Sequence, residues 1–320
     1  MNLTVSSSPH VRGNDSTRRI MRDVNIALLP ALIFGIVHFG VSAAIVTVVC
    51  ILAAVVTELA ANRFLIRDHR ELDGSAVVTG MLLAMTLPST TPWWVAAIGS
   101  VFAILVVKAM CGGLGQNAFN PALAARALLM LVFPVYLVRY FEPQGLLGTA
   151  DAVTAATPLH HMVMPALPEQ SLTDMFLGNI PGCIGEVSTL ALLVGGAYLV
   201  YRRVISLRIP LAYLGTVAVL TLVFHKTDNA LAWMLYSLMG GGVMLGAIFM
   251  ATDYATSPVL PRAQLIYGVG CGVLTMLLRY NSLYPEGVTY AILLMNACAW
   301  ALDKLLPPVR FGVRKGGEAG

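Results

Sequence analysis

The sequence predicts an all-α polytopic membrane protein of about ten transmembrane helices, arranged as two inverted five-helix repeats with both termini cytoplasmic. Three observations lead to this class: an apolar composition, long apolar runs, and basic residues gathered on one side. Of the 320 residues, 58% are hydrophobic and 11% are charged, with a mean hydropathy of +0.78. A soluble domain carries about 25% charged residues. Because so few charges cannot cover a water-facing surface, most of the chain must face lipid or other apolar helices.

The predicted spans follow from the lengths of the apolar runs. A bilayer core of about 30 Å needs roughly 20 apolar residues per helix. The first five spans are 24–40, 41–61, 75–88, 93–111 and 121–138. The second five are 183–201, 208–225, 230–251, 264–280 and 287–305. The run 24–61 is too long for one helix, and we divide it near residues 38–42, where a glycine and polar residues permit a tight turn.

Lys and Arg residues set the orientation of these spans. With the N-terminus inside, sixteen of them fall on the cytoplasmic side, whereas Arg139, Lys226 and Arg279 fall on the other side and Arg126 lies within a span. This asymmetry is the positive-inside pattern. The chain then divides into a cytoplasmic segment (1–23), a first repeat (24–138), an external loop (139–182), a second repeat (183–305) and a cytoplasmic tail (306–320).

The two halves resemble each other in sequence. Residues 79–86 match 245–252 at an offset of 166, and residues 117–121 match 281–285 at an offset of 164. An odd number of spans in each copy inverts the second copy in the membrane. The corresponding third and eighth spans both contain glycines, Gly80 and Gly246 among them. Paired broken spans are typical of a midplane binding site, but glycines also permit close helix packing, and the two interpretations are compatible.

The external loop contains the segment DAVTAATPL, residues 151–159. It combines an acidic residue, Asp151, with a small polar residue, Thr154, and a hydroxyl, that of Thr157, beside a turn-favouring proline. Such a hydroxyl is accessible to a modifying enzyme. By itself the segment is also compatible with an ordinary Asx turn or a helix cap.

The segment resembles the flavinylation pattern Asp-x-x-Ser/Thr-x-Ala-Thr. Four further blocks are similar to the RnfD family, the D subunits of Rnf ion-translocating oxidoreductases. Several of these blocks are shared with the related NqrB subunits of the sodium-pumping NADH:quinone oxidoreductase. The blocks are LDGSAVVTG (72–80), GGLGQNAFNPA (112–122), MATDYATSP (250–258) and YPEGV (284–288). The resemblance covers about residues 20–305, and one departure is Ala155, where many members have glycine.

This resemblance implies that a flavin transferase joins FMN through a phosphoester to Thr157, with Asp151, Thr154 and Ala156 as its recognition context. FMN is an electron carrier. The resemblance also implies a second, non-covalent flavin (riboflavin) among the helices. The candidate residues for that flavin, or for an ion path, are Gly80, Asn117, Asn120, Gly246 and Asp253.

The function that the resemblance implies is that of a membrane subunit in an Rnf-type complex. Such a complex couples electron transfer between ferredoxin and NAD+ to movement of Na+ or H+. The expected partners are the other Rnf subunits (A, B, C, E and G), the flavin transferase and membrane lipid, and the expected location is the prokaryotic plasma (inner) membrane. A flavin-free channel or facilitator is the rival interpretation, since inverted repeats serve that use as well.

Several other polar residues have both a functional and a structural interpretation. Glu58, Arg126 and Glu186 fall in or near spans, where an ionisable group is either functional or paired within the bundle. His160 and His161 follow the flavin motif as solvated residues or flavin contacts. The five cysteines have no C-x-x-C spacing, so no iron–sulfur or zinc site is predicted. Because no nucleotide-binding fingerprint or nucleic-acid surface is visible, reaction with NAD+ or ferredoxin is expected on partner subunits.

Overall fold

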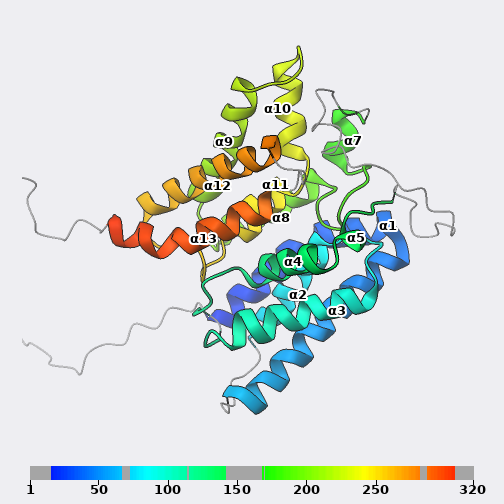
Figure 1. Ribbon diagram of the computed structural model, residues 1–320, viewed down its shortest axis with the longest axis vertical. Coiled ribbons are helices and arrows are strands. Elements are labelled where there is room, and N and C mark those ends of the chain that lie inside the picture. The colour runs from blue at the N-terminus through cyan, green and yellow to red at the C-terminus, as the bar shows by residue number, and fades with distance from the viewer. Residues whose placement is uncertain are drawn as a thin grey trace, which may run out of the picture.

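The computed structural model describes residues 16–66, 73–113, 115–141, 168, 170–281 and 287–306. Most of this described part is helical, and it has no β-strand, only an isolated bridge between Pro88 and Cys183. The helices, of which η1 to η3 are π-helices, are α1 (Thr17–Ala61), η1 (Asn62–Ile66), α2 (Ser75–Thr86), α3 (Trp93–Phe102), η2 (Ala103–Ala109), α4 (Pro121–Val132), α5 (Pro134–Leu137), α7 (Leu172–Leu177), α8 (Thr189–Tyr201), α9 (Arg208–Val223), α10 (Ala230–Met239), α11 (Val243–Leu245), η3 (Gly246–Met250), α12 (Pro261–Asn281) and α13 (Val288–Leu305) (Figure 1).

Several helices are long and apolar enough to cross a membrane. Three described stretches meet that condition alone: Thr17–Phe64, Pro261–Asn281 and Val288–Leu305. A fourth candidate is the pair Ala230–Met239 and Val243–Met250, bent by 62°. Five shorter apolar helices complete the set. The all-α membrane class is thus confirmed in the described part of the chain, while ten spans, inverted repeats and cytoplasmic termini stay predictions.

α1 is a helical hairpin rather than one helix. Gly40 has φ 72° and ψ −154°, far from helical values, and this left-handed φ suits a residue without Cβ. Two arms of α1 therefore lie on either side of Gly40 (Figure 1). The predicted division near residues 38–42 is confirmed.

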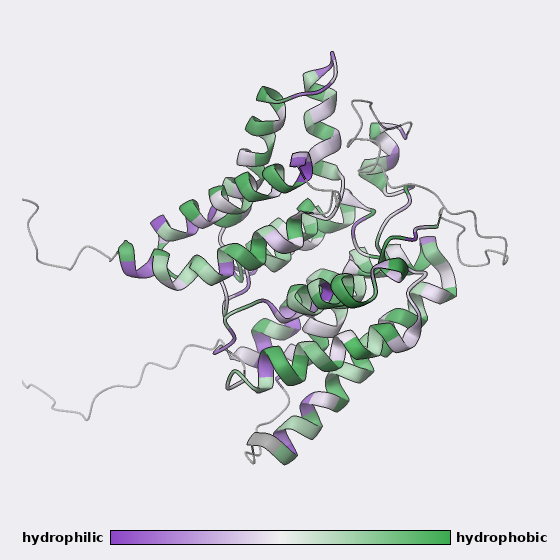
Figure 2. Ribbon diagram, in the orientation of Figure 1, coloured by the Kyte–Doolittle hydropathy of each residue, from purple (hydrophilic) through white to green (hydrophobic). Residues whose placement is uncertain are grey.

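Apolar side chains cover the outside of the helices. On α1, Ile33, Val41 and Val56 are all more than half exposed. Figure 2 shows hydrophobic residues along the helices and hydrophilic ones concentrated near helix ends and connecting segments. A continuous apolar outer surface of this kind is compatible with lipid contact and not with water.

Small residues bring the helices into close contact. A Cβ built on Gly35 of α1 would lie 2.0 Å from the carbonyl oxygen of Ile184, and one on Gly195 of α8 would lie 2.1 Å from that of Ala27. Helices whose neighbours also lie in an apolar solvent associate through such close backbone packing. α1 accordingly packs against α2, α3 and α8, and α9 against α10 and α12.

Three predicted spans differ from the helices of the structure, and one of them, 121–138, is interrupted at Phe133 between α4 and α5. The span predicted at 183–201 begins only at Thr189, because residues 183–188 form turns whose backbone pairs with the end of α2. The span predicted at 230–251 is interrupted between Met239 and Val243. Glycines fill that interruption, where Gly240 ends α10 and Gly242 begins α11.

The starts of three helices recur at a nearly constant distance along the chain. α11, α12 and α13 begin 168, 168 and 167 residues after α2, α3 and α4. α2 and α11 also share the same kind of N-cap, a left-handed glycine: Gly74 with φ 83° and Gly242 with φ 70°.

Candidate functional site

The predicted flavin attachment residue, Thr157, lies outside the described residues, as do its motif residues Asp151, Thr154 and Ala156. His160 and His161 lie outside them as well. The roles assigned to these residues therefore stay predictions.

The described segments that flank this loop are fixed to the helix bundle. On the N-terminal side, the Thr90 hydroxyl donates to the carbonyl of Arg139 at 2.7 Å. On the C-terminal side, the Tyr236 hydroxyl of α10 donates to the carbonyl of Gln170 at 2.7 Å. The described residues on both sides of the loop are therefore hydrogen-bonded to the helix bundle.

The bundle contains two interrupted helices whose free backbone groups are satisfied by neighbours. α2 ends at Thr86, and the N–H groups of Ile184 and Gly185 donate to the carbonyls of Leu87 and Met85 at 3.1 and 2.8 Å. Such pairing is required because terminal helix carbonyls have no intrahelical donor, and lipid supplies none. The turns at 183–188 therefore act as a cap for α2.

The second interrupted helix is capped by a charged side chain. The buried guanidinium of Arg279, on α12, donates to the carbonyls of Ser237 and Gly240 at 2.7 Å each and to that of Gly241 at 3.2 Å. A cation at a helix C-terminus also interacts favourably with the helix dipole. The glycine-rich break between α10 and α11 is thus held in one geometry.

A buried ion pair lies between these two breaks. Arg126 Nη1, on α4, donates to Glu186 Oε1 at 3.0 Å, and the two side chains are only 6% and 8% exposed. Arg126 Nη2 lies 3.6 Å from the sulfur of Cys183. The pair borders a cavity of about 10 Å³ that Thr86, Gly242 and Thr289 also line. A cavity of this size is about the smallest that can hold one water molecule.

Both charges of this pair are buried beside the broken helices. Ionisable groups at membrane depth are costly and usually functional or paired. Arg126 and Glu186 were both expected in or near spans, and the structure brings them together from opposite sides of the long loop. The ion pair joins α4 to the turns at 183–188 that cap α2.

A second polar site joins the two halves of the chain at the start of α4. Asn120 caps α4, its Oδ1 accepting from the N–H groups of Ala122 and Leu123 at 3.1 and 3.3 Å. Its Nδ2 donates to the carbonyl of Met250, the last residue of η3, at 3.3 Å. The loop that carries Asn117 and Asn120 is thereby held beside the loop that carries Asp253.

Asn117 and Asp253 differ in whether their side-chain oxygens have hydrogen-bond partners. Asn117 is buried, and its Oδ1 has no hydrogen-bond partner within the described residues. Asp253 accepts a hydrogen bond from the Thr256 hydroxyl at 3.1 Å, and burial raises the pKa of its carboxyl above the usual 3.8. A free buried acceptor and a neighbouring carboxyl that favours its protonated form could both contact a polar ligand.

The two candidate glycines serve helix contacts. A Cβ on Gly80 would lie 2.9 Å from the carbonyl oxygen of Cys50 and from Cα of Ile51, both on α1. A Cβ on Gly246 would lie 2.5 Å from a methyl of Val288 on α13. The space beside each glycine is therefore filled by a neighbouring helix, as the packing alternative expected.

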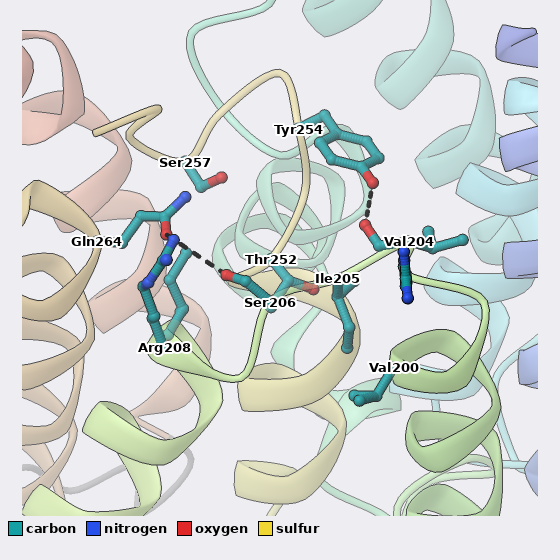
Figure 3. Close-up of a pocket in the computed structure, with 11 residues that line it drawn as sticks. Val200, Val204, Ile205, Ser206, Arg208, Thr252, Tyr254, Ser257 and Gln264 are labelled. Atoms are coloured by element: carbon teal, nitrogen blue, oxygen red, sulfur yellow. Dashed lines mark hydrogen bonds between the residues drawn. The ribbon is translucent and has the colours of Figure 1, made fainter. Parts of the chain in front are cut away.

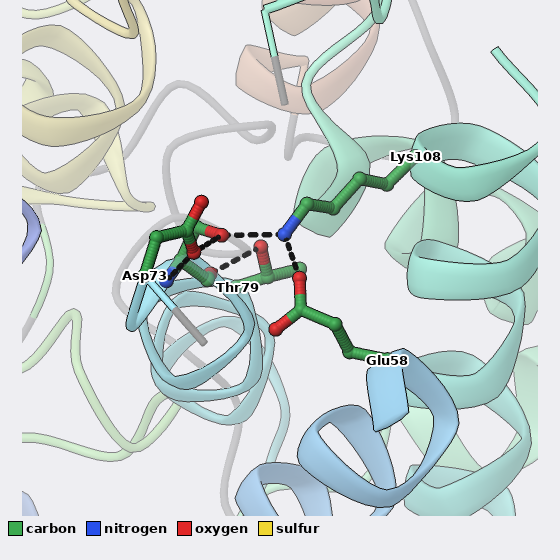
Figure 4. A network of polar contacts seen from close by, with 5 residues as sticks. Glu58, Asp73, Thr79 and Lys108 are labelled. Carbon is green, nitrogen blue, oxygen red and sulfur yellow. Dashed lines mark hydrogen bonds and ion pairs between the residues drawn. The ribbon is translucent and has the colours of Figure 1, made fainter. Parts of the chain in front are cut away.

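A third charged cluster joins α1, α2 and η2 (Figure 4). The ammonium of Lys108 donates to Glu58 Oε1 and to the hydroxyl of Ser75, which in turn contacts Asp73. Both charged side chains are buried, with exposures of 7% for Lys108 and 10% for Glu58. Glu58 was expected to be either functional or paired within the bundle, and its partner is Lys108, fifty residues away. Sequence reasoning missed this pairing, although a lysine directly after an apolar run was a visible signal.

A family model described as NQR2, RnfD, RnfE matches residues 4–312 of the sequence. The chain belongs to this family. Its relatives in the NQR2, RnfD, RnfE family include proteins from several bacteria. The D subunit of the Na+-translocating ferredoxin:NAD+ oxidoreductase complex of Acetobacterium woodii is 45% identical, with 98% of this chain and 97% of the relative aligned. The D subunit of the proton-translocating complex of Clostridium ljungdahlii is 43% identical over the same shares. The D subunit of an ion-translocating oxidoreductase complex of Halorhodospira halophila is 37% identical over 96% and 94%.

Three of the four sequence blocks that resemble the family lie where helices are joined by polar contacts. Block 72–80 holds Asp73 and Ser75 of the Lys108 cluster, block 112–122 holds Asn117 and Asn120, and block 250–258 holds Asp253. Only the beginning of α13 is described from the fourth block, 284–288. The family resemblance was therefore carried by segments that connect helices at polar sites.

Proposed function

We propose that this chain is the flavin-carrying membrane D subunit of an Rnf-type complex, which couples ferredoxin:NAD+ oxidoreduction to translocation of Na+ or H+. The observation that carries the proposal is the full-length match to the D subunits of two ferredoxin:NAD+ oxidoreductase complexes, at 45% and 43% identity. One of those relatives is named for Na+ and the other for protons. The ion moved here is therefore left as Na+ or H+.

The redox role rests on Thr157. The motif at 151–157 supports covalent attachment of FMN through a phosphoester, and the bound FMN would supply one- or two-electron transfer. The test is flavin fluorescence of the chain after denaturing electrophoresis, from cells that also make a flavin transferase. The band of the natural chain is expected to fluoresce and that of Thr157→Ala to be dark. Thr149→Ala, in the same loop but outside the motif, is the matched control and should fluoresce fully.

The proposed arrangement in the membrane is ten spans in two inverted repeats, with both termini cytoplasmic and the 139–182 loop external. The recurring helix starts, 167 or 168 residues apart, support two copies of one unit. The left-handed glycine caps of α2 and α11 support the pairing of the two broken spans. Cysteine labelling from outside the cell tests this: Ala150→Cys should react with an impermeant maleimide, and Gly316→Cys should not.

A non-covalent flavin is proposed at the junction of Asn117, Asn120 and Asp253. The residues fit such a group in part, because the buried Oδ1 of Asn117 is free to accept from a ring N–H. Gly80 and Gly246 contribute close packing between helices rather than open space. In a Thr157→Ala background, Asn117→Ala should lower the flavin released on denaturation. Asn281→Ala, at the end of α12, should leave it unchanged.

The second candidate function is a flavin-free channel or facilitator. The paired helix breaks with the Arg126–Glu186 pair beside them favour it, since broken spans line the substrate sites of transporters. Vesicles that contain this chain alone distinguish the two functions. Solute flux without any redox partner would favour the channel, whereas ion movement that requires electron transfer in the whole complex would favour the redox role.

A further inference from the structure

A cavity of about 410 Å³ opens between the end of α8, the α8–α9 turn and the loop that follows η3 (Figure 3). Its polar lining comes from seven side chains: Arg203, Ser206, Arg208, Thr252, Tyr254, Ser257 and Gln264. The Tyr254 hydroxyl donates to the carbonyl of Val204 across one edge, which joins the two loops. A cavity of this volume accommodates a small-molecule group.

The charge of the cavity is positive. Arg203 and Arg208 both line it, and no carboxylate does. Within the described residues neither arginine forms an ion pair; Arg208 contacts only the amide oxygen of Gln264, at 3.5 Å. Two guanidinium groups without carboxylate partners provide the planar, multiple donors that phosphate oxygens accept from.

The backbone adds to this positive field. Among the described residues Arg203 is the one non-glycine with positive φ, at 57°. Non-glycine residues rarely adopt this conformation, and the turn holds Arg203 in it beside the cavity. α9 begins at Arg208 after Leu207, whose side chain cannot cap it. The N–H groups of Arg208 and Ile209, the first two residues of this 16-residue helix and both part of the cavity lining, therefore have no acceptor on the N-cap side chain. The third residue, Pro210, has no N–H.

The surroundings of the cavity are apolar and exposed. Leu207 and Leu211 of α9 are 49% and 63% exposed, and Leu265 of α12 is 48% exposed. Each of these follows or precedes a lining residue by one to three positions. Arginines directly beside outward-facing leucines mark the level at which the polar headgroups of a bilayer lie.

We propose that this cavity binds the phosphate group of an anionic membrane phospholipid, with Arg203 and Arg208 as its main donors. The hydroxyls of Ser206 and Ser257 and the amide of Gln264 complete the set of polar groups around the phosphate. The acyl chains extend along the exposed leucines of α9 and α12. The proposal rests on the cavity alone, so it stands whether or not Thr157 carries a flavin.

The test uses the full-length chain, purified with the subunits that accompany it in a neutral detergent. Short-chain phosphatidylglycerol is titrated, with short-chain phosphatidylcholine and inorganic phosphate in parallel, and bound species are counted by native mass spectrometry. The variants are Arg203→Asn, which tolerates positive φ, Arg208→Gln, and both together. Arg262→Gln, an exposed arginine at the start of α12 that does not line the cavity, is the matched control.

We expect phosphatidylglycerol to bind the natural chain more tightly than phosphatidylcholine or inorganic phosphate does. Each single variant should weaken binding about fivefold and the double variant about 25-fold, with Arg262→Gln within about twofold. Equal binding by the double variant and the natural chain would overturn the proposal. Binding of inorganic phosphate as tight as that of phosphatidylglycerol would show a site for a soluble phosphate instead. Loss of an accompanying subunit with unchanged lipid binding would show a protein contact instead.

Discussion

The buried pair of Arg126 and Glu186 can be tested by removing its charges one at a time. Glu186→Gln keeps the shape of the side chain and Arg126→Met keeps its unbranched stem, while each removes one charge. The space is too tight for larger changes, since a Cβ on Gly242 would already lie 2.5 Å from Glu186 Oε1. The double variant removes both charges together.

The magnitude follows from the geometry. Opposite charges 3.0 Å apart attract by about 5 kcal/mol at an effective dielectric constant of about 20. Burial of both groups costs a similar amount, so the pair as a whole contributes little net stability. Removal of one partner breaks this buried ion pair, which costs about 3–5 kcal/mol. We therefore expect either single variant to lose about that much, and the double variant to lie within about 2 kcal/mol of the natural chain.

The measurement is the free energy of unfolding in mixed micelles, for the natural chain, both single variants and the double variant. This cycle isolates the coupling energy of the two side chains. Asp23 and Arg202, whose atoms are also 3.0 Å apart but whose arginine is 30% exposed, form the comparison pair. Its coupling should be smaller and should fall with added salt. A coupling energy near zero for Arg126 and Glu186 would refute the assignment of a buried, mutually dependent pair.

Three further predictions concern other parts of the bundle. Gly195→Ala should destabilise the protein by about 1–3 kcal/mol or more, because the added Cβ would overlap the carbonyl of a neighbouring helix. Gly215→Ala, whose Cβ would have no atom within 4 Å, should be neutral or stabilising. Equal free energies of unfolding for the two variants would contradict the close helix contact at Gly195. The raised pKa of Asp253 means that its contribution to stability is complete below its unfolded-state pKa of about 4 and is lost as the pH rises through the raised folded-state pKa. The stability of the natural chain should therefore fall more steeply with rising pH over this range than that of Asp253→Asn, and parallel pH profiles would contradict this. Lys108→Met should cost about 3–5 kcal/mol and Glu58→Gln should restore most of it, and failure of that rescue would show that the two charges are not coupled.

Much of the fold could be predicted because lipid restricts what an apolar sequence can do. The composition and run lengths predict helices, and the turn in the 24–61 run was predicted correctly at a glycine between polar residues. The turns at 183–188 were predicted as helix, since an apolar run looks the same whether its backbone bonds to itself or to another segment. Here Ile184 and Gly185 bond to the end of α2, a partner about a hundred residues earlier.

The charged contacts were less accessible to sequence reasoning. Glu58, Arg126 and Glu186 could be recognised as unusual in apolar surroundings, but their partners lie 50 or 60 residues away. The repeat was visible, although the matched glycines at an offset of 166 differ by two residues from the offset of the helix starts. The sequence match aligns the glycines that contact neighbouring helices, whereas the helix starts are set by the glycine caps, which are 168 residues apart.

The measurement that tests the central claim most directly is mass spectrometry of the peptide that contains Thr157, from the chain made together with a flavin transferase. The flavin-carrying role predicts that Thr157 bears the mass of FMN less one water, and that the same peptide from the Thr149→Ala variant bears it too. Full recovery of this peptide with an unmodified Thr157, from a complex that still transfers electrons, would contradict the claim.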